Sequence, residues 1–122
     1  PGESKWNGLL SLKYWKLPDK AYLSDLISDS FKYIDRERTM ASAPPEYSNV
    51  IDYDKKVYGT VVEWKGNGVA SPIQFYLTDS LENFIHGQII VKYDSYRQAE
   101  QRLNHFKSGL LAIINTLEWL QD

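Results

Sequence analysis

Three segments between residues 57 and 93 alternate between apolar and polar side chains, and this pattern constrains the fold more than any other feature of the chain. Such alternation is typical of strands with two different faces, and it occurs in Val57–Trp64, Ile73–Thr78 and Phe84–Tyr93. The residues 65–68 (Lys-Gly-Asn-Gly) and 78–80 (Thr-Asp-Ser) separate the three segments and have the composition of turns. The pattern therefore predicts an antiparallel meander of three strands.

Two amphipathic helices are predicted, one on either side of this meander in the sequence. Asp19 is the N-cap candidate of the first helix, whose stripe at helical spacing consists of Leu23, Leu26, Ile27, Ser30, Phe31 and Ile34. Asp94 or Ser95 can cap the second helix, and Gln98 completes a capping box with Ser95. The second stripe covers about six turns and consists of Ala99, Leu103, Phe106, Leu110, Ile113, Ile114, Leu117 and Leu120. We expect the second helix to be the main cover of the core.

The order of the elements indicates the fold class. Residues Gly8–Trp15 are predicted to form one more strand, whereas residues 41–49, which include two adjacent prolines, are expected to form a loop. The order strand, helix, three strands, helix favours an α+β fold, with two helices packed on an antiparallel sheet. A length of 122 residues suits one domain, and residues 1–7 are expected to be an unstructured or artificial start.

Composition excludes several classes of function. The net charge is -2 and the basic residues are scattered, so the basic patch of a nucleic-acid-binding protein is missing. The absence of cysteine excludes disulfides, zinc-thiolate sites and thiol catalysis within this sequence. No run approaches the roughly 20 apolar residues of a membrane helix, so a soluble domain is expected.

Polar residues suggest no catalytic or metal site. His86 and His105 lie on different predicted elements, and His86 is expected to be a solvated or hydrogen-bonded strand residue rather than a ligand. Asp52 and Asp54 could pair as carboxylates, but structural acidity at a turn is the better interpretation. The segment 66–68 lacks the lysine and helix start of a phosphate loop. We expect no catalytic residue, metal or cofactor.

Four strand aromatics, Trp15, Tyr58, Trp64 and Tyr76, have two interpretations. They could form a platform that stacks on a sugar or a peptide, or they could lie beneath the first helix as a second core layer. The second interpretation is favoured, because a domain with two helices usually covers its sheet thoroughly.

Most of the chain, roughly residues 8 to 119, resembles the carboxy-terminal part of the GldD family of gliding-motility lipoproteins. The resemblance is carried by residues 56–59 (Lys-Val-Tyr-Gly), 63–67 (Glu-Trp-Lys-Gly-Asn), 70–80 (Ala-Ser-Pro-Ile-Gln-Phe-Tyr-Leu-Thr-Asp-Ser), 84–87 (Phe-Ile-His-Gly) and 115–119 (Asn-Thr-Leu-Glu-Trp). There are three departures from the family: His86 where an arginine is usual, a one-residue insertion at Gly68, and no lipobox cysteine or amino-terminal strand region. The chain is therefore expected to be a trimmed piece or a shorter relative. The pattern more faintly resembles the Mog1/PsbP-like α/β/α sandwich.

The resemblance implies a Bacteroidota cell-envelope lipoprotein linked to gliding and to type IX secretion, without known catalytic activity or cofactor. Our first hypothesis is thus a periplasmic, membrane-anchored accessory domain that contacts envelope proteins. The alternatives are a small-ligand or glycan-binding module and an uncharacterised hydrolase, the latter with no motif in its support. The candidate interaction surface includes the loop 41–49 and consists otherwise of Trp15, Tyr58, Trp64, Gln74, Tyr76, Thr78, Asp79, Ser80 and His86.

Overall fold

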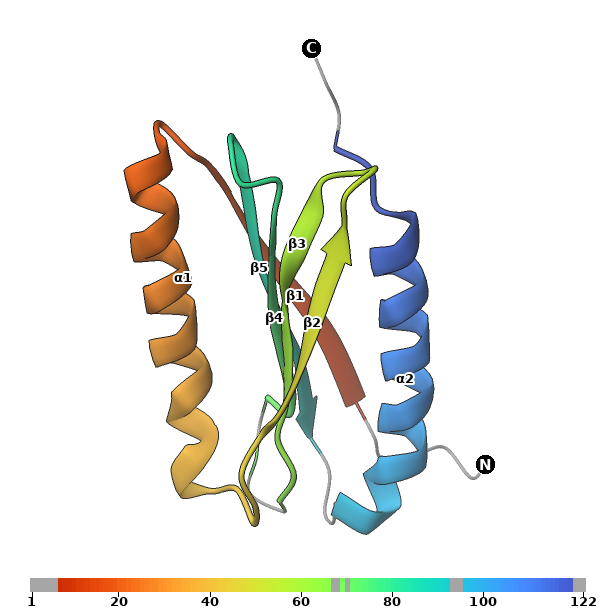
Figure 1. The fold of residues 1–122 in the computed structure, drawn as a ribbon. Coiled ribbons are helices and arrows are strands. Elements are labelled where there is room, and N and C mark those ends of the chain that lie inside the picture. The colour runs from red at the N-terminus through yellow and green to blue at the C-terminus, as the bar shows by residue number, and fades with distance from the viewer. Residues whose placement is uncertain (1–6, 67–68, 70, 93–95, 120–122) are drawn as a thin grey trace.

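The structure, a computed structural model, describes residues 7–66, 69, 71–92 and 96–119. The elements in chain order are β1 (Asn7–Lys16), α1 (Lys20–Ile34), the short 3-10 helix η1 (Asp35–Thr39), β2 (Glu46–Asp52), β3 (Val57–Glu63), β4 (Ile73–Thr78), β5 (Asn83–Lys92) and α2 (Tyr96–Thr116). The described residues form one five-stranded antiparallel sheet in the order β1-β5-β4-β3-β2. Figure 1 shows α1 on one face of this sheet and α2 on the other.

The predicted α+β fold is confirmed, with two helices and an antiparallel sheet. The predicted strands match β1, β3, β4 and β5 to within a residue or two at each end. Most of the expected start at residues 1–7 lies outside the described residues, as do Tyr93, the capping candidates Asp94 and Ser95, and Leu120.

One strand was missed by the sequence analysis. Part of the predicted loop 41–49 belongs to β2, which begins one residue after Pro45 and pairs with β3 in a register that sets Tyr47 opposite Val62. β2 lies at the edge of the sheet and each of its residues is exposed or only half-buried. An edge strand without a buried face lacks the alternation that reveals a strand in sequence, and only its pairing with β3 defines it.

The connection between β3 and β4 is longer than the tight hairpin predicted at residues 65–68. β3 ends at Glu63 and β4 begins at Ile73, and the Trp64 backbone N–H donates to the Pro72 carbonyl at 2.7 Å. Gly66 has a φ of 148°, and a Cβ there would come within 2.7 Å of the Met40 carbonyl oxygen. Glycine therefore lets the connection pass against the segment that follows η1.

The face of the sheet that α2 covers contains a compact apolar cluster. Its buried members are Val57, Val61, Ile73, Phe75, Leu77, Ile89, Leu110 and Ile114. Leu117 packs against this cluster although it follows the end of α2. Ile113 was expected in the buried stripe, but it is 57% exposed, because it lies on the flank of the helix beside Leu110 and Ile114. The side chains of Ala99, Leu103 and Phe106 lie outside the described part of the structure.

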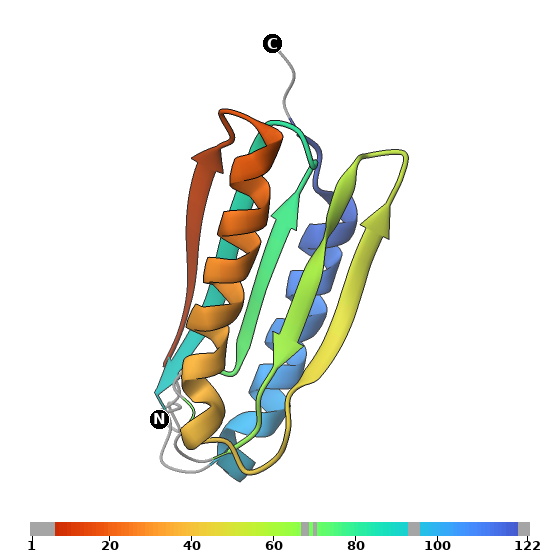
Figure 2. The ribbon, with the colours of Figure 1, turned by 60° about the vertical axis from the view of Figure 1, so that its left-hand side comes forward.

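The face that α1 covers is richer in aromatic and polar residues. The Asp19 side chain caps α1 by accepting the Tyr22 backbone N–H at 3.2 Å, as predicted. Two buried clusters lie beneath the helix, one containing Ile34, Val62, Trp64 and Val69, the other Leu17, Leu26 and Phe84. Figure 2 shows that the helices are offset: α1 lies in front of β5 and β4, whereas α2 lies behind β3 and β2. α1 therefore reaches β2 where the Phe31 ring lies 6.5 Å from the Tyr47 ring, whereas Ile51 on the same side of the strand stays exposed.

None of the helices formed by the described residues has the length and apolar character required to cross a bilayer.

Candidate functional site

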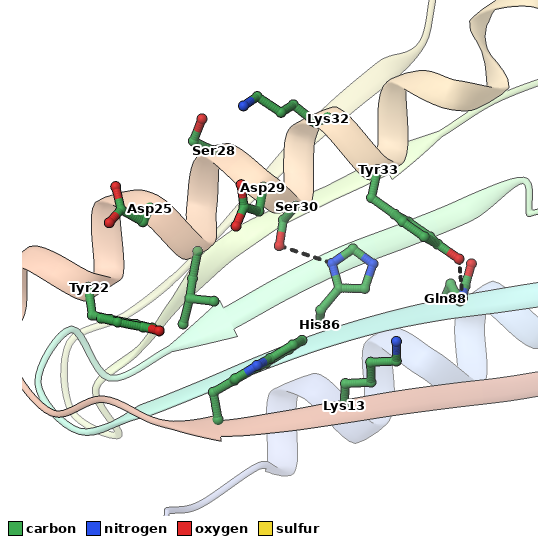
Figure 3. Close-up of a pocket in the computed structure, with 12 residues that line it drawn as sticks. Lys13, Tyr22, Asp25, Ser28, Asp29, Ser30, Lys32, Tyr33, His86 and Gln88 are labelled. Carbon is green, nitrogen blue, oxygen red and sulfur yellow. Dashed lines mark hydrogen bonds between the residues drawn. The ribbon is translucent and has the colours of Figure 1, made fainter.

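A polar pocket of about 630 Å³ opens between α1 and the two strands β1 and β5. Figure 3 shows side chains from all three elements around it. α1 contributes Tyr22, Asp25, Asp29, Ser30, Lys32 and Tyr33; β1 contributes Lys13 and Trp15; and β5 contributes His86 and Gln88. We call this the α1–β5 pocket. Its β5 residues lie more than 50 positions from those of β1 and α1 in the sequence, so only the packing of α1 on the sheet assembles it.

His86 is the most deeply buried polar side chain of the α1–β5 pocket that comes from the sheet, with 8% of its surface exposed. Its Nδ1 lies 3.0 Å from the Ser30 hydroxyl oxygen, whereas its Nε2 has no hydrogen-bond partner among the residues that the structure describes. Burial, together with the charge of Lys13 on the neighbouring strand, lowers the pKa of His86. The imidazole is therefore neutral at pH 7 and retains one nitrogen that can accept or donate, depending on the tautomer. The expectation of a hydrogen-bonded histidine is met, but that of a solvated one is wrong.

A chain of hydrogen bonds fixes the wall of the pocket beside His86. The Ser71 hydroxyl donates to Gln88 Oε1 at 2.8 Å, and Gln88 Nε2 donates to the Tyr33 hydroxyl oxygen at 3.2 Å. The Tyr33 ring stands nearly perpendicular to the His86 ring, with 5.4 Å between the ring centroids. Gln88 and Tyr33 are thus held in place before any ligand arrives.

The charges around the α1–β5 pocket are balanced. Lys13 and Lys32 carry positive charge, and Asp25 and Asp29 carry negative charge. None of the four forms an ion pair with another residue that the structure describes. The pocket therefore offers both donors and acceptors without favouring a simple cation or anion.

Most of the predicted aromatic platform lies beneath α1. The Trp64 side chain is 1% exposed, and the Tyr76 ring stacks on Phe84 at 5.6 Å and meets Phe31 of α1 at 5.9 Å. Trp15 packs edge-on against Phe84 but also lines the α1–β5 pocket. These three rings belong to the core layer under the helix, as the favoured interpretation predicted. Tyr58 is half-buried and contacts the Tyr53 ring at the far end of the sheet.

The turn at residues 78–80 is built by its own side chains. Asp79 Oδ1 accepts the backbone N–H groups of Leu81, Glu82 and Asn83, each at 2.9 Å, and Asp79 Oδ2 accepts the Asn83 amide at 2.8 Å. Burial by itself would raise the pKa of Asp79, but these hydrogen bonds outweigh it and hold the pKa below its usual value. Thr78 donates to the Asn83 carbonyl at 2.6 Å and accepts the Ser80 N–H at 2.9 Å. Asp79 and Thr78 thus stabilise the turn.

The remaining candidates lie apart from the α1–β5 pocket. Gln74 is 1% exposed, and its Oε1 has no hydrogen-bond partner within the described part of the chain. The Asp52 carboxylate accepts the Lys55 N–H at 3.0 Å in the β2–β3 turn, in agreement with the structural interpretation, and Asp54 is exposed. Within the described ranges, no three His, Asp or Glu side chains are placed so that they could hold a metal ion.

The exposed side of β2 is the second notable surface. Tyr47, Ile51 and Tyr53 are 56%, 59% and 77% exposed; we call these three residues the β2 strip. Side chains at alternate positions of a strand project to the same face, so Tyr47 and Ile51 share the α1 side of the sheet with Val62 and Tyr58, their partners in β3. A hollow of about 430 Å³ adjoins Tyr47 and is lined also by Phe31 and Trp64.

Sequence reasoning named single members of both surfaces, Trp15 and His86 for the pocket and the segment 41–49 for β2, but it did not assemble either surface. Ser30 is the one polar residue in the predicted stripe of the first helix, and a hydroxyl at a buried position needs a hydrogen-bond partner. His86 is that partner. For the β2 strip, the residues Tyr47, Val50 and Ile51 have high strand propensity, but they follow two prolines and lie among polar residues.

These observations define a three-layer α/β/α domain with a preformed polar pocket under one helix and an exposed edge strand. A family model described as gliding motility lipoprotein GldD matches residues 4–119 of this chain. The chain therefore belongs to the GldD family of gliding motility lipoproteins, which confirms the resemblance seen in the sequence. Membership associates it with gliding motility and, as a lipoprotein, with the cell envelope. Comparisons with curated proteins and with solved structures found no significant match.

Proposed function

We propose that this domain is a non-catalytic accessory part of a periplasmic lipoprotein in a bacterium of the Bacteroidota, and that it binds proteins of the gliding or type IX secretion machinery. Membership of the GldD family supports the link to motility and to the envelope. The observation that carries the proposal of protein binding is the β2 strip, three exposed large side chains on the edge strand β2 and at its end.

The two edges of the sheet differ in how they are protected against pairing. Natural proteins usually place charged residues, lysine above all, on exposed edge strands. β1 carries Lys13 and Lys16, whereas the charges of β2 are Glu46 and Asp52 at its two ends. Between Tyr47 and Ile51, β2 therefore carries no charged side chain along the edge of the sheet.

This arrangement fits an extended segment of a partner protein. Such a segment can add to β2 as a further strand through main-chain hydrogen bonds, and its alternate side chains can pack on the β2 strip. The hollow between Tyr47, Phe31 and Trp64 provides a place for one apolar side chain. A role of the Thr78–Ser80 turn, the other proposed contact, would be limited to its backbone and to Ser80, because Asp79 and Thr78 bond within the turn.

The test is a pull-down with the full-length, membrane-tethered protein in its native host, followed by mass spectrometry. The double variant Ile51→Lys/Tyr53→Lys places charge on the β2 strip, and Ile113→Lys is the matched control because Ile113 is equally exposed but lies on α2. We expect motility or secretion components to be recovered with the wild type and the control, but not with the strip variant. Urea unfolding should differ by less than about 0.5 kcal/mol among the three proteins, as is usual for surface changes.

Reproducible absence of any envelope partner with the wild type would count against the accessory role. Recovery of the same partners with the strip variant would instead exclude β2 as the contact surface. In that case the turn at residues 78–80 would be the next surface to mutate.

A further inference from the structure

We propose that the α1–β5 pocket binds a carbohydrate, an uncharged ligand with several adjacent hydroxyl groups. This inference does not rest on the protein contacts proposed above, because the α1–β5 pocket and the β2 strip lie on opposite sides of α1 and share no residue.

The charge of the lining favours a neutral ligand that both donates and accepts hydrogen bonds. An anion would meet the carboxylates of Asp25 and Asp29 at the α1 rim, and a cation would meet Lys13 on β1. A hydroxyl group can donate to a carboxylate and accept from an ammonium or amide group at the same time. Adjacent hydroxyls can therefore satisfy both kinds of partner across the pocket.

His86 supplies the strongest indication that a polar ligand group is missing. A buried polar atom without a partner costs about 1–3 kcal/mol in the folded protein, and His86 Nε2 is such an atom. Its ring is fixed by Ser30 on one side and by the perpendicular Tyr33 ring on another. Because the imidazole is neutral, a hydroxyl suits Nε2 in either tautomer: it donates to the bare nitrogen or accepts from the N–H.

Rings at the mouth of the pocket provide the apolar part of the site. Trp15 on β1 is half-buried, and Tyr22 and Tyr33 on α1 are 49% and 37% exposed. Aromatic rings combine a large apolar face with a polar tip, which suits the C–H face and the hydroxyl edge of a sugar. The volume of about 630 Å³ lies within the range of small-molecule sites, which is roughly 300–1,000 Å³.

The experiment titrates the whole chain, labelled with nitrogen-15, with three neutral trisaccharides: maltotriose, cellotriose and chitotriose. NMR follows the Gln88 side-chain amide and the Trp15 indole N–H, which both report on the pocket. We expect saturable shifts of both signals with at least one of the three sugars. Glycylglycine and acetate, added separately, represent a zwitterion and an anion, and neither should reproduce these shifts.

Two exposed residues on opposite walls test whether donors and acceptors act together. Lys13→Ala and Asp29→Ala should each raise the dissociation constant about tenfold, the effect of losing one hydrogen bond to a charged group. Lys65→Ala and Asp54→Ala are the matched controls, since both residues are exposed and neither lines the pocket. The proposal is overturned if no trisaccharide shifts the two signals, if only glycylglycine or acetate does, or if both pocket variants bind the sugar as tightly as the wild type.

Discussion

The two faces of the sheet are built from different chemistry. The α2 face is almost entirely aliphatic, with Phe75 as its one buried ring among the described residues. Its buried charge, Glu63, lies near the edge of the cluster, and Lys107 of α2 pairs with it at 2.5 Å. The α1 face instead buries Thr60, Gln74, Thr78 and His86 among aromatic rings. The three buried side-chain atoms that lack a partner in the described structure belong to residues on this face or at its border: Trp64 Nε1, Gln74 Oε1 and His86 Nε2.

This difference suggests that the α2 face mainly stabilises the fold, whereas the α1 face carries the candidate binding surfaces. Apolar burial stabilises a fold roughly in proportion to the area removed from water, so the aliphatic α2 face should provide a large part of the stability, together with the clusters around Trp64 and Phe84 beneath α1. Buried polar groups without partners reduce stability, and proteins often retain them at functional sites. The α1–β5 pocket and the β2 strip both belong to the α1 side of the sheet, in agreement with this division.

Truncation of a buried side chain on the α2 face should cause the largest loss in the free energy of unfolding. Phe75 is 2% exposed, and its ring lies directly over Gly87, where a Cβ would be only 2.1 Å from it. Phe75→Ala should reduce the free energy of unfolding by about 3–5 kcal/mol, because it removes a large ring and leaves a cavity. Urea unfolding measures this loss. Tyr53→Ala, at a 77% exposed position, is the control and should change stability by less than about 0.5 kcal/mol. A loss below 1 kcal/mol for Phe75→Ala would contradict the assignment of stability to the α2 face.

The free energy of unfolding should depend on pH because His86 is buried in the folded protein. Its pKa is lowered in the folded protein by burial and by Lys13, so the unfolded chain takes up the proton first, near its ordinary value of about 6.5. The stability contributed by the neutral ring is fully present above that pH and falls as the pH decreases from about 6.5 toward the lower folded pKa. Urea unfolding between pH 8 and pH 5 should show this decline in the wild type.

His86→Phe keeps a ring at the same position but cannot titrate, so the decline should be smaller in this variant. The comparison between the two proteins cancels the contribution of His105, which both contain. Identical pH profiles would show that His86 takes up a proton equally well in the folded and unfolded states, and would argue against its burial.

The smallest change in the free energy of unfolding is expected when a buried polar side chain is removed from the α1 face. Gln74 is 1% exposed, its Oε1 is unpaired, and its Nε2 makes only a long hydrogen bond of 3.5 Å to the Ser71 carbonyl. Gln74→Leu should therefore stay within about 1 kcal/mol of the wild type, on the stabilising side. The adjacent change Ile73→Gln introduces the same amide on the α2 face and should cost at least about 2 kcal/mol. Equal losses from the two changes in urea unfolding would show that the faces do not differ in their tolerance of polar groups.

The sequence predicted the elements in which apolar residues recur at a regular spacing. The stripe of α1 follows from burial of one face, whereas β3 and β4 are buried on both faces and owe their alternation to Thr60, Gln74 and Thr78 on the α1 side. β2 was missed because no residue of this edge strand is fully buried, so its two faces differ little in polarity. The exposure of Ile113 was missed for a related reason, since spacing alone does not say where along its flank a helix meets the sheet.

The candidate site could be predicted only in fragments. Ser30 and His86 were each visible as polar residues in otherwise patterned segments, but they are 56 residues apart and nothing in the sequence joins them. Asp79 was placed correctly in a turn because Thr-Asp-Ser turns depend on local hydrogen bonds between side chain and backbone.

The sequence by itself determined the α+β class, most element boundaries and the family to which the chain belongs, because these depend on local periodicity and on strings of neighbouring residues. Only the tertiary structure decided that α1 and α2 are offset, that His86 faces Ser30 and that much of β2 stays exposed. Those features depend on the position on the sheet at which each helix packs so that its apolar stripe is buried. That choice is made by contacts between residues distant in sequence, which no local pattern encodes.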